Sequence, residues 1–235
     1  FPALKSLQLN QCTELSDVNL LSSLTSLTHL SLYECESLAD SGIQSLVQLT
    51  ALRRLDLQDS QITHTGPLAS MTALEELDIS HCFELTDEGL RPLSSLRRLQ
   101  YLSLRGYLLN DNGQLTGEGL QFLPACLARL DLEYCSGLTD ASLEGLPRLM
   151  SLQELIVSNT NVGDADVHAL CSLVPSLTKL DLRSCKSITD AGFSSLSSLS
   201  SLKNLLVYAT NIGDAGIRAI VSLPSLAKLD LSYCK

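Results

Sequence analysis

The sequence predicts an α/β solenoid in which about ten strand-helix repeats of roughly 25 residues stack into a horseshoe with a parallel sheet on its concave side. Three observations predict this fold. The apolar composition depends on one residue type, because the 235 residues include 54 Leu but only 4 Phe, 6 Tyr and no Trp. The spacing L-x-x-L-x-L recurs ten times at intervals of 22 to 28 residues. Within each copy, the apolar period changes from that of a strand to that of a helix.

Each copy begins with a predicted strand. The ten copies start at Leu4, Leu27, Leu52, Leu74, Leu99, Leu127, Leu152, Leu177, Leu202 and Leu226. A helical segment follows each strand, and in the eighth copy it shows as a three-residue apolar spacing over 190–199. One such unit leaves a leucine face uncovered until the next unit packs on it, so stacking creates the core. Strands about 4.8 Å apart make the concave sheet roughly 43 Å long, the largest continuous surface of the molecule.

The fifth copy is irregular. Its interval is 28 residues, and Tyr107–Leu115 contains the turn formers Asn110, Asp111, Asn112 and Gly113. We expect this segment to form a loop on the rim of the horseshoe. The repeats run through the whole sequence, so 1–235 is predicted to be one repeat domain. Because the chain starts and stops inside repeat units, we expect it to be part of a longer protein.

Six of the eight cysteines share one position, three residues after the last apolar residue of the strand: Cys12, Cys35, Cys82, Cys135, Cys185 and Cys234. From the second copy onward, copies with and without this cysteine alternate, which gives a higher period of about 50 residues. We expect these thiols to turn into the solenoid and to bond backbone groups of the turn. A nucleophilic cysteine would need a neighbouring base and an electropositive setting instead.

The residues around these cysteines resemble a known family. Residues 82–90 (CFELTDEGL) and 185–193 (CKSITDAGF) are similar to the cysteine-containing class of leucine-rich repeat. The alternating form at 210–217 (TNIGDAGI) resembles leucine-rich repeat arrays of protist and bacterial proteins. The resemblance covers the whole chain and implies a leucine-rich repeat solenoid. Since the cysteine-containing class is familiar from F-box/LRR proteins, it also implies a substrate receptor of a cullin-RING ubiquitin ligase.

Composition and spacing argue against several other functions. The net charge of -10 has the wrong sign for contact with nucleic-acid phosphates or an anionic lipid surface. No apolar stretch approaches the roughly 18 residues of a membrane span, so membrane insertion is not expected. The sequence has no C-x-x-C pair and its four His are scattered, so no metal ion or other cofactor is expected. Repeated unpaired thiols indicate a reducing compartment, and we expect an intracellular protein of the cytoplasm, nucleus or cytoskeleton.

One set of aspartates opens the helical segments, where a carboxylate can cap free backbone amides. This set comprises Asp17, Asp40, Asp87, Asp140, Asp164, Asp190 and Asp214. A feature repeated seven times is an element of architecture, whereas a catalytic carboxylate is unique. The chain is therefore not predicted to be an enzyme.

A second set of aspartates stands in the middle of the strand motif and faces out of the concave sheet: Asp56, Asp78, Asp131, Asp181 and Asp230. Basic residues two positions earlier are expected to neutralise four of the five in ion pairs along the strand. Asp78 is the exception, because Glu76 stands beside it and Asp56 lies in the adjacent strand. This acidic cluster is predicted to meet a basic segment of a partner.

The predicted partner site lies on the concave face. Tyrosine is favoured at interfaces, and five of the six Tyr fall on outward strand positions or in the adjoining turn. Ile156 and Leu206 replace the usual Asp and are expected to place apolar side chains on a wet face. The alternative is that these two pack on each other or against a flanking domain. The predicted site comprises Tyr134, Ile156, Lys179, Asp181, Arg183, Leu206 and Tyr208, with Tyr101 and Asp78 as further contacts.

The sequence therefore predicts a non-catalytic protein-interaction module that binds a partner protein on its concave face. Its specific form is the substrate receptor of a ubiquitin ligase that the resemblance implies. The alternative is a structural scaffold subunit of a cytoskeletal, flagellar or ribonucleoprotein assembly. Neither the partner nor the oligomeric state follows from the sequence, since one solenoid serves many unrelated recognitions.

Overall fold

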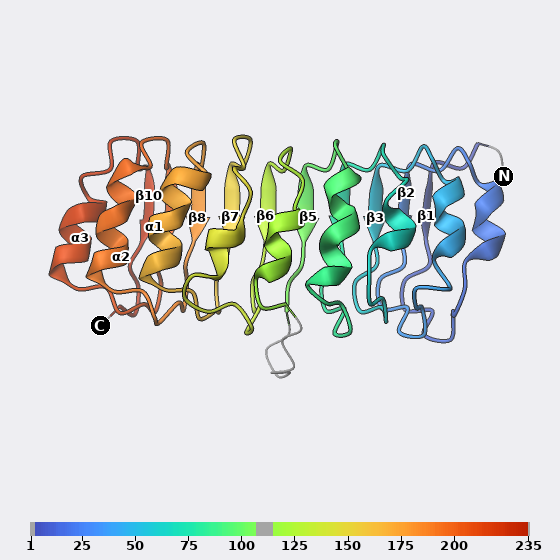
Figure 1. Cartoon of the computed structure of the whole chain (residues 1–235), viewed down its shortest axis with the longest axis horizontal. Coiled ribbons are helices and arrows are strands. Elements are labelled where there is room, and N and C mark those ends of the chain that lie inside the picture. The colour runs from blue at the N-terminus through green and yellow to red at the C-terminus, as the bar shows by residue number, and fades with distance from the viewer. Residues whose placement is uncertain (1–2, 107–114, 235) are drawn as a thin grey trace.

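The computed structural model describes residues 3–106 and 115–234. In this part of the chain, ten three-residue strands form one parallel sheet in chain order (Figure 1), which confirms the predicted fold class. The strands are Ser6–Gln8 (β1), His29–Ser31 (β2), Arg54–Asp56 (β3), Glu76–Asp78 (β4), Tyr101–Ser103 (β5), Arg129–Asp131 (β6), Glu154–Ile156 (β7), Lys179–Asp181 (β8), Asn204–Leu206 (β9) and Lys228–Asp230 (β10). The predicted rim loop at 107–115 lies, except for Leu115, outside the described residues.

Helical segments connect the strands, and most of them are 3₁₀ helices. These are Asn19–Ser23 (η1), Gln44–Gln48 (η2), Gly66–Leu68 (η3), Glu88–Ser95 (η4), Glu118–Phe122 (η5), Ser142–Gly145 (η6) and Leu196–Ser198 (η7). The α-helices are Asp164–Leu173 (α1), Asp190–Ser195 (α2) and Asp214–Ile220 (α3). Proline favours the 3₁₀ form in η4, because Pro92 lies inside the segment and lacks the N–H donor that an α-helix requires there.

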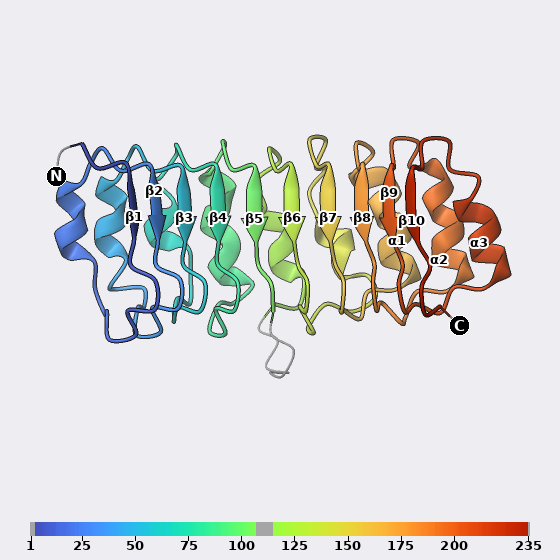
Figure 2. The ribbon, with the colours of Figure 1, turned by 180° about the vertical axis from the view of Figure 1, so that it is seen from behind.

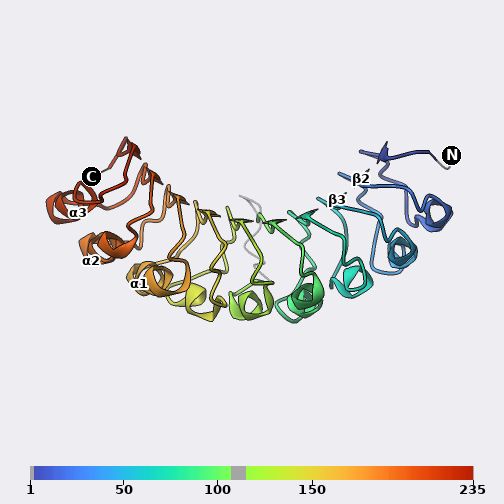
Figure 3. The ribbon, with the colours of Figure 1, turned by 90° about the horizontal axis from the view of Figure 1, so that it is seen from above.

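The molecule has two layers on a curved axis. Seen from above, the strands line the inner side of an arc and the helical segments its outer side (Figure 3). The central leucine of each strand pairs with that of the next, from Leu7 with Leu30 to Leu205 with Leu229. Apart from the two end strands, these leucines are buried between the layers. The first and third residues of each strand consequently face the concave side, which the helical segments leave uncovered (Figure 2).

The repeated cysteines turn into the solenoid and bond the backbone, as predicted. Each thiol donates to the carbonyl of the last apolar strand residue in the preceding repeat, at Sγ–O distances of 3.1 to 3.4 Å. The pairs are Cys35 with Leu9, Cys82 with Leu57, Cys135 with Leu104, Cys185 with Val157 and Cys234 with Val207. Cys12, in the first repeat, is exposed.

A shared carbonyl links each threonine copy to the cysteine copy that follows it. The Val157 carbonyl accepts a hydrogen bond from Thr160 of its own repeat at 2.6 Å and another from Cys185 of the next repeat at 3.1 Å. The same arrangement recurs one period later at Val207. A carbonyl oxygen has two lone pairs, so a threonine copy followed by a cysteine copy satisfies it fully. At Val157 and Val207, one period of about 50 residues apart, the repeat is thus also a repeat of paired hydrogen bonds.

The aspartates that open the helical segments bond mainly to the following repeat, so the prediction that they cap their own segment is wrong for most of them. In a typical case, Asp164 Oδ1 accepts the N–H groups of Thr189 at 2.8 Å and of Gly192 at 3.0 Å. Asp40, Asp87, Asp140 and Asp190 also bond to the next repeat, whereas Asp17 bonds within its own. Parallel stacking places the free amides of the next helical turn beside each carboxylate.

Candidate partner-binding surface

The concave face carries two rows of side chains, from the first and the third residue of each strand. In the middle of the third-position row four residues are buried, with exposed fractions of 0% for Ser103, 3% for Asp131, 7% for Ile156 and 2% for Asp181. The expectation that Ile156 is exposed is therefore wrong. The sheet curves toward this face (Figure 3), so side chains on strands about 4.8 Å apart crowd together at its centre.

Asp181 and Arg183 form a closed ion pair at this centre. Arg183 Nε lies 2.8 Å from Asp181 Oδ1, and Nη2 lies 2.6 Å from Oδ2. The hydrogen bonds from Arg183 to this carboxylate hold the pKa of the guanidinium above its usual range. Asp181 also stands between Ile156 and Leu206 in the strand register. The structure thus brings Asp181 and Arg183 together as predicted. Their charges neutralise each other, so neither is left for a partner.

The predicted ion pairs along each strand do not form. Cations of the first-position row pair across strands instead, as Arg129 and Lys179 do with Glu154 at 3.7 and 3.4 Å. The strand aspartates accept the N–H two residues on, as Asp78 Oδ1 does from Ser80 at 3.0 Å. This local turn, which the other four strand aspartates share, explains why Asp recurs at the end of the strands.

Tyr134 lies at the margin of the same network. Its backbone is left-handed, with a φ of 61°, and its N–H donates to the Ser158 carbonyl at 3.0 Å. The preceding residue, Glu133, accepts hydrogen bonds from the Arg105 guanidinium and from the Ser158 hydroxyl. The centre of the concave face, over β5–β8, is therefore held together by its own hydrogen bonds and ion pairs.

Leu206 and Tyr208 remain partly exposed at the C-terminal end of the concave face. The ring centroid of Tyr208 lies 5.0 Å from that of Tyr233, at an interplanar angle of 60°. Tyr233 itself is 79% exposed. We call Leu206, Tyr208 and Tyr233 the C-terminal patch. Of the predicted contacts, Leu206 and Tyr208 belong to this patch.

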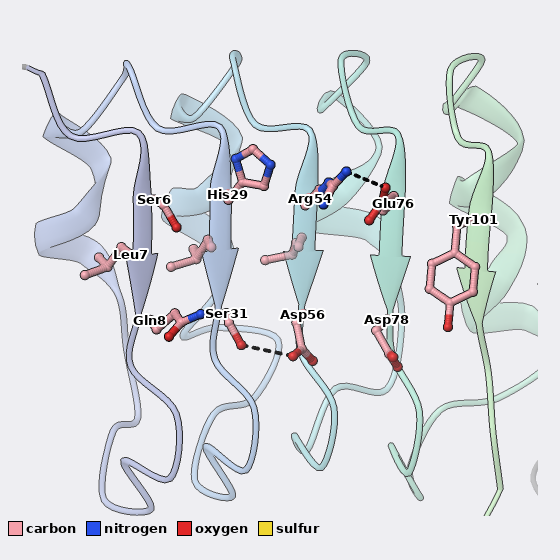
Figure 4. A pocket seen from close by; sticks show the side chains of 12 residues that line it. Ser6, Leu7, Gln8, His29, Ser31, Arg54, Asp56, Glu76, Asp78 and Tyr101 are labelled. Atoms are coloured by element: carbon pink, nitrogen blue, oxygen red, sulfur yellow. Dashed lines mark hydrogen bonds and ion pairs between the residues drawn. The ribbon is translucent and has the colours of Figure 1, made fainter.

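A hollow of about 330 Å³ opens at the other end of the concave face (Figure 4). It is lined by all residues of β1, β2 and β3 together with Glu76, Asp78 and Tyr101, and we call it the acidic hollow. Three carboxylates and one guanidinium line it, so its formal charge is -3 + 1 = -2 with His29 neutral. The sequence pointed to Asp56, Glu76 and Asp78 as an acidic cluster and to Tyr101 as a contact. It did not assign the other lining residues to this site, although aligning the repeats strand by strand would have found them.

Asp56 and Asp78 are neighbours in the register of β3 and β4. Asp56 Oδ1 accepts the Gln58 N–H at 3.1 Å, and Oδ2 accepts the Ser31 hydroxyl at 2.9 Å. Burial raises the pKa of Asp56, and the negative charge of Asp78 raises this pKa further. Within residues 3–106 and 115–234, no Lys or Arg pairs with either carboxylate, because Arg54 bonds to Glu76 at 3.1 Å (Figure 4).

Tyr101 closes the acidic hollow at β5. The Arg129 guanidinium lies 5.0 Å from the centroid of its ring, which is a cation–π distance. Burial raises the pKa of the Tyr101 hydroxyl. The ring is thus fixed from one side by a cation and offers the hollow an aromatic wall.

The buried repeated cysteines are poorly suited to nucleophilic chemistry. Burial raises the pKa of Cys82 and of Cys135 to about 12 and that of Cys185 to about 11, whereas a reactive cysteine needs a lowered pKa. Among the residues that the structure describes, no three His, Cys, Asp or Glu side chains group as a metal ion would require. No helix in the same residues combines the length and the apolar character needed to cross a membrane. What the concave face provides is a polar and aromatic contact surface.

Sequence comparison agrees with this architecture. The family model described as Zer-1-like, leucine-rich repeats, matches residues 1–81, and a second leucine-rich repeat model matches residues 70–94, 148–171 and 175–197. The protein is a leucine-rich repeat protein. None of the curated protein sequences matches it significantly.

Solved structures share the fold of this leucine-rich repeat protein at low sequence identity. An internalin (inlF) of Listeria monocytogenes is 20% identical with a TM-score of 0.54, over 92% of this chain and 71% of the internalin. A chain of the TLR13-ssRNA13 complex is 20% identical with a TM-score of 0.66, over 98% of this chain and 36% of that one. A chain of the mouse RP105/MD-1 complex is 19% identical with a TM-score of 0.62, over 99% and 43%. These likenesses establish the fold.

Proposed function

We propose that the protein is a non-catalytic module that binds a partner protein on its concave face. An extended concave surface is what solenoid proteins generally use for binding. Here the helical segments cover only the opposite side of the sheet (Figures 2 and 3). Two structural neighbours come from complexes, one of TLR13 with ssRNA13 and one of RP105 with MD-1, which supports a binding role for the fold.

The observation that carries the proposal is the division of the concave face into a closed centre and two open ends. The centre bonds to itself, through pairs such as Asp181 with Arg183. The acidic hollow is open at one end and the C-terminal patch at the other. Partly exposed tyrosines such as Tyr208 give large contact area at low entropy cost. We therefore assign the contacts to the two ends and a supporting role to Ile156 and Asp181.

A protein suits this surface better than a nucleic acid does. The net charge of -10 opposes contact with phosphates. Because a protein of this fold occurs in a complex with ssRNA13, the fold alone does not exclude RNA, and the prediction depends on charge. Binding of a labelled single-stranded RNA to the protein at low salt tests it, and micromolar affinity would contradict it.

The identity of the bound partner would decide between two cellular roles. The resemblance to F-box/LRR proteins favours a substrate receptor of a ubiquitin ligase, and a scaffold subunit of a larger assembly is the alternative. The cysteines from Cys12 to Cys234 are all free, which supports a reducing, intracellular compartment. Subunits of a ligase among the bound proteins would favour the first role, and subunits of one stable assembly the second.

Affinity purification with quantitative mass spectrometry tests the proposal. The concave variant carries Leu206→Asp with Tyr208→Ala, both at partly exposed residues, so the core at Ile156 stays intact. The matched control carries Met150→Asp with Gln121→Ala at exposed positions outside the concave sheet. We expect specific proteins to be lost from the concave variant and kept by the control. Proteins kept by both variants, or lost from both alike, would contradict binding at the C-terminal patch.

A further inference from the structure

The acidic hollow carries negative charge that its own residues do not neutralise. Its formal charge is -2, from Asp56, Glu76 and Asp78 against Arg54. The guanidinium of Arg54 is already 3.1 Å from Glu76. Figure 4 shows the carboxylates of Asp56 and Asp78 side by side on the open side of the strands, with Tyr101 beyond them. Two neighbouring carboxylates on an uncovered surface therefore lack a counter-charge among the described residues.

The C-terminal repeats provide an internal comparison. Two positions after Asp181 stands Arg183, whose guanidinium lies 2.6 Å from that carboxylate. At the same position after Asp56 and Asp78 stand Gln58 and Ser80. The repeat can thus hold a cation at this place, and in the acidic hollow it does not.

The floor of the acidic hollow is the sheet itself, between the two polar rows. Leu30 and Leu55 line it, but each is only 2% exposed because its side chain belongs to the core. Lysine and arginine side chains have long stems and charged ends, so they can lie across the sheet while the end meets a carboxylate. The hollow extends over five strands, a span of roughly 19 Å, and same-side residues of an extended segment are about 7 Å apart. Two or three basic side chains of one segment fit this length.

We infer that the acidic hollow binds an extended lysine- or arginine-rich segment of the partner protein. The inference rests on the proposed function, because it specifies the chemistry that one open end of the concave face receives. Such a segment supplies the counter-charge that Asp56 and Asp78 lack. An acidic segment or a nucleic acid would instead add negative charge to a site whose formal charge is already -2.

Fluorescence anisotropy with a labelled octapeptide of alternating lysine and serine tests the inference. The test variant carries Asp56→Asn with Asp78→Asn, which keeps the Oδ1 acceptors for Gln58 and Ser80. We expect affinity to fall about fivefold or more, since two charge-assisted contacts are lost. The matched control carries Glu118→Gln with Glu144→Gln, which changes the net charge equally at exposed sites of η5 and η6. Its affinity should stay within about twofold of the unaltered protein.

A gain of affinity provides a second test that misfolding cannot imitate. Arg54→Gln removes the guanidinium that bonds to Glu76 and leaves the acidic hollow with a third free carboxylate. We expect the lysine peptide to bind about twofold more tightly to this variant. Weaker binding to Arg54→Gln would overturn the inference.

Several other outcomes would also overturn it. The first is an equal loss of peptide affinity in the test and control variants, and the second is an unchanged peptide affinity in the test variant. The third is that a peptide of alternating glutamate and serine, or a single-stranded RNA, binds the unaltered protein as tightly as the lysine peptide does. The peptide affinities can contradict the inference while the Leu206→Asp, Tyr208→Ala variant still loses the captured proteins. In that case the assignment of a basic segment to the acidic hollow is wrong and the proposed function stands. If peptide binding depends on the acidic hollow but capture survives every concave variant, the proposed function fails separately.

Discussion

At the residue scale, the environment of each repeated cysteine decides its chemistry. A thiol that donates to a buried carbonyl, as Cys185 does to Val157 at 3.1 Å, gains from staying protonated. Burial acts in the same direction, because it disfavours the thiolate. The cysteines are therefore polar links between repeats, although their chemical type permits nucleophilic or metal-binding roles.

Alkylation of the native protein at pH 8 should follow burial. We expect iodoacetamide to modify Cys12 first, because it is exposed. Cys82, Cys135 and Cys185 should react last, since burial raises their pKa values to about 12, about 12 and about 11. Peptide mass spectrometry over time measures the order, with urea-unfolded protein as the control. Modification of any of these three as fast as that of Cys12 would contradict the assignment.

At the element scale, the aspartates at the helical segments join one repeat to the next. Asp164 stands at the start of α1 but satisfies amides at the start of α2. The bond therefore acts between elements, and its loss should weaken the stacking of repeats as well as one helix end. The sequence period located these aspartates. The sequence does not identify the amides that these aspartates bind. An aspartate at a helix start has the same sequence pattern whether it caps its own helical segment or that of the next repeat.

Replacing Asp164 by alanine should destabilise the protein more than the same change at Asp214. Asp164→Ala leaves the Thr189 and Gly192 amides without their acceptor, so we expect the free energy of unfolding to fall by about 2 kcal/mol. Asp214 starts α3 and is exposed, so Asp214→Ala should cost only about 0.5 kcal/mol through the helix dipole. Urea unfolding followed by circular dichroism measures both. Equal losses would show that the bond to the next repeat contributes little.

At the scale of the whole molecule, curvature divides the concave face. The inward curve crowds the third-position side chains over β5–β8 and buries Ile156 and Asp181. Toward the ends the same row opens, at Asp56 and Asp78 in one direction and at Leu206 in the other. An Asp at the same place in the repeat is consequently a structural group in the centre and an accessible carboxylate near the end.

The repeat pattern predicts the fold well and the surface less well. Strand positions, their parallel order and the inward cysteines follow from leucine spacing, because each repeat contains its own signal. The burial of Ile156 and the ion pair of Lys179 with Glu154 do not follow from leucine spacing, since they depend on side chains of neighbouring repeats. The acidic hollow lies between these cases. The acidic cluster around Asp78 is visible in the sequence. The extent of the hollow and the ion pair between Arg54 and Glu76 are seen only in the structure.

Hydroxyl-radical footprinting of the complex with a captured partner tests the central claim, binding at the concave face, most directly. We predict that the partner lowers the modification of Tyr208, Tyr233 and Tyr101, which lie on the concave side. Modification of Met150 and Val221, exposed at 54% and 66% away from that face, should stay unchanged. Protection of Met150 and Val221 with unaltered tyrosines would place the partner on the outer side and contradict the account.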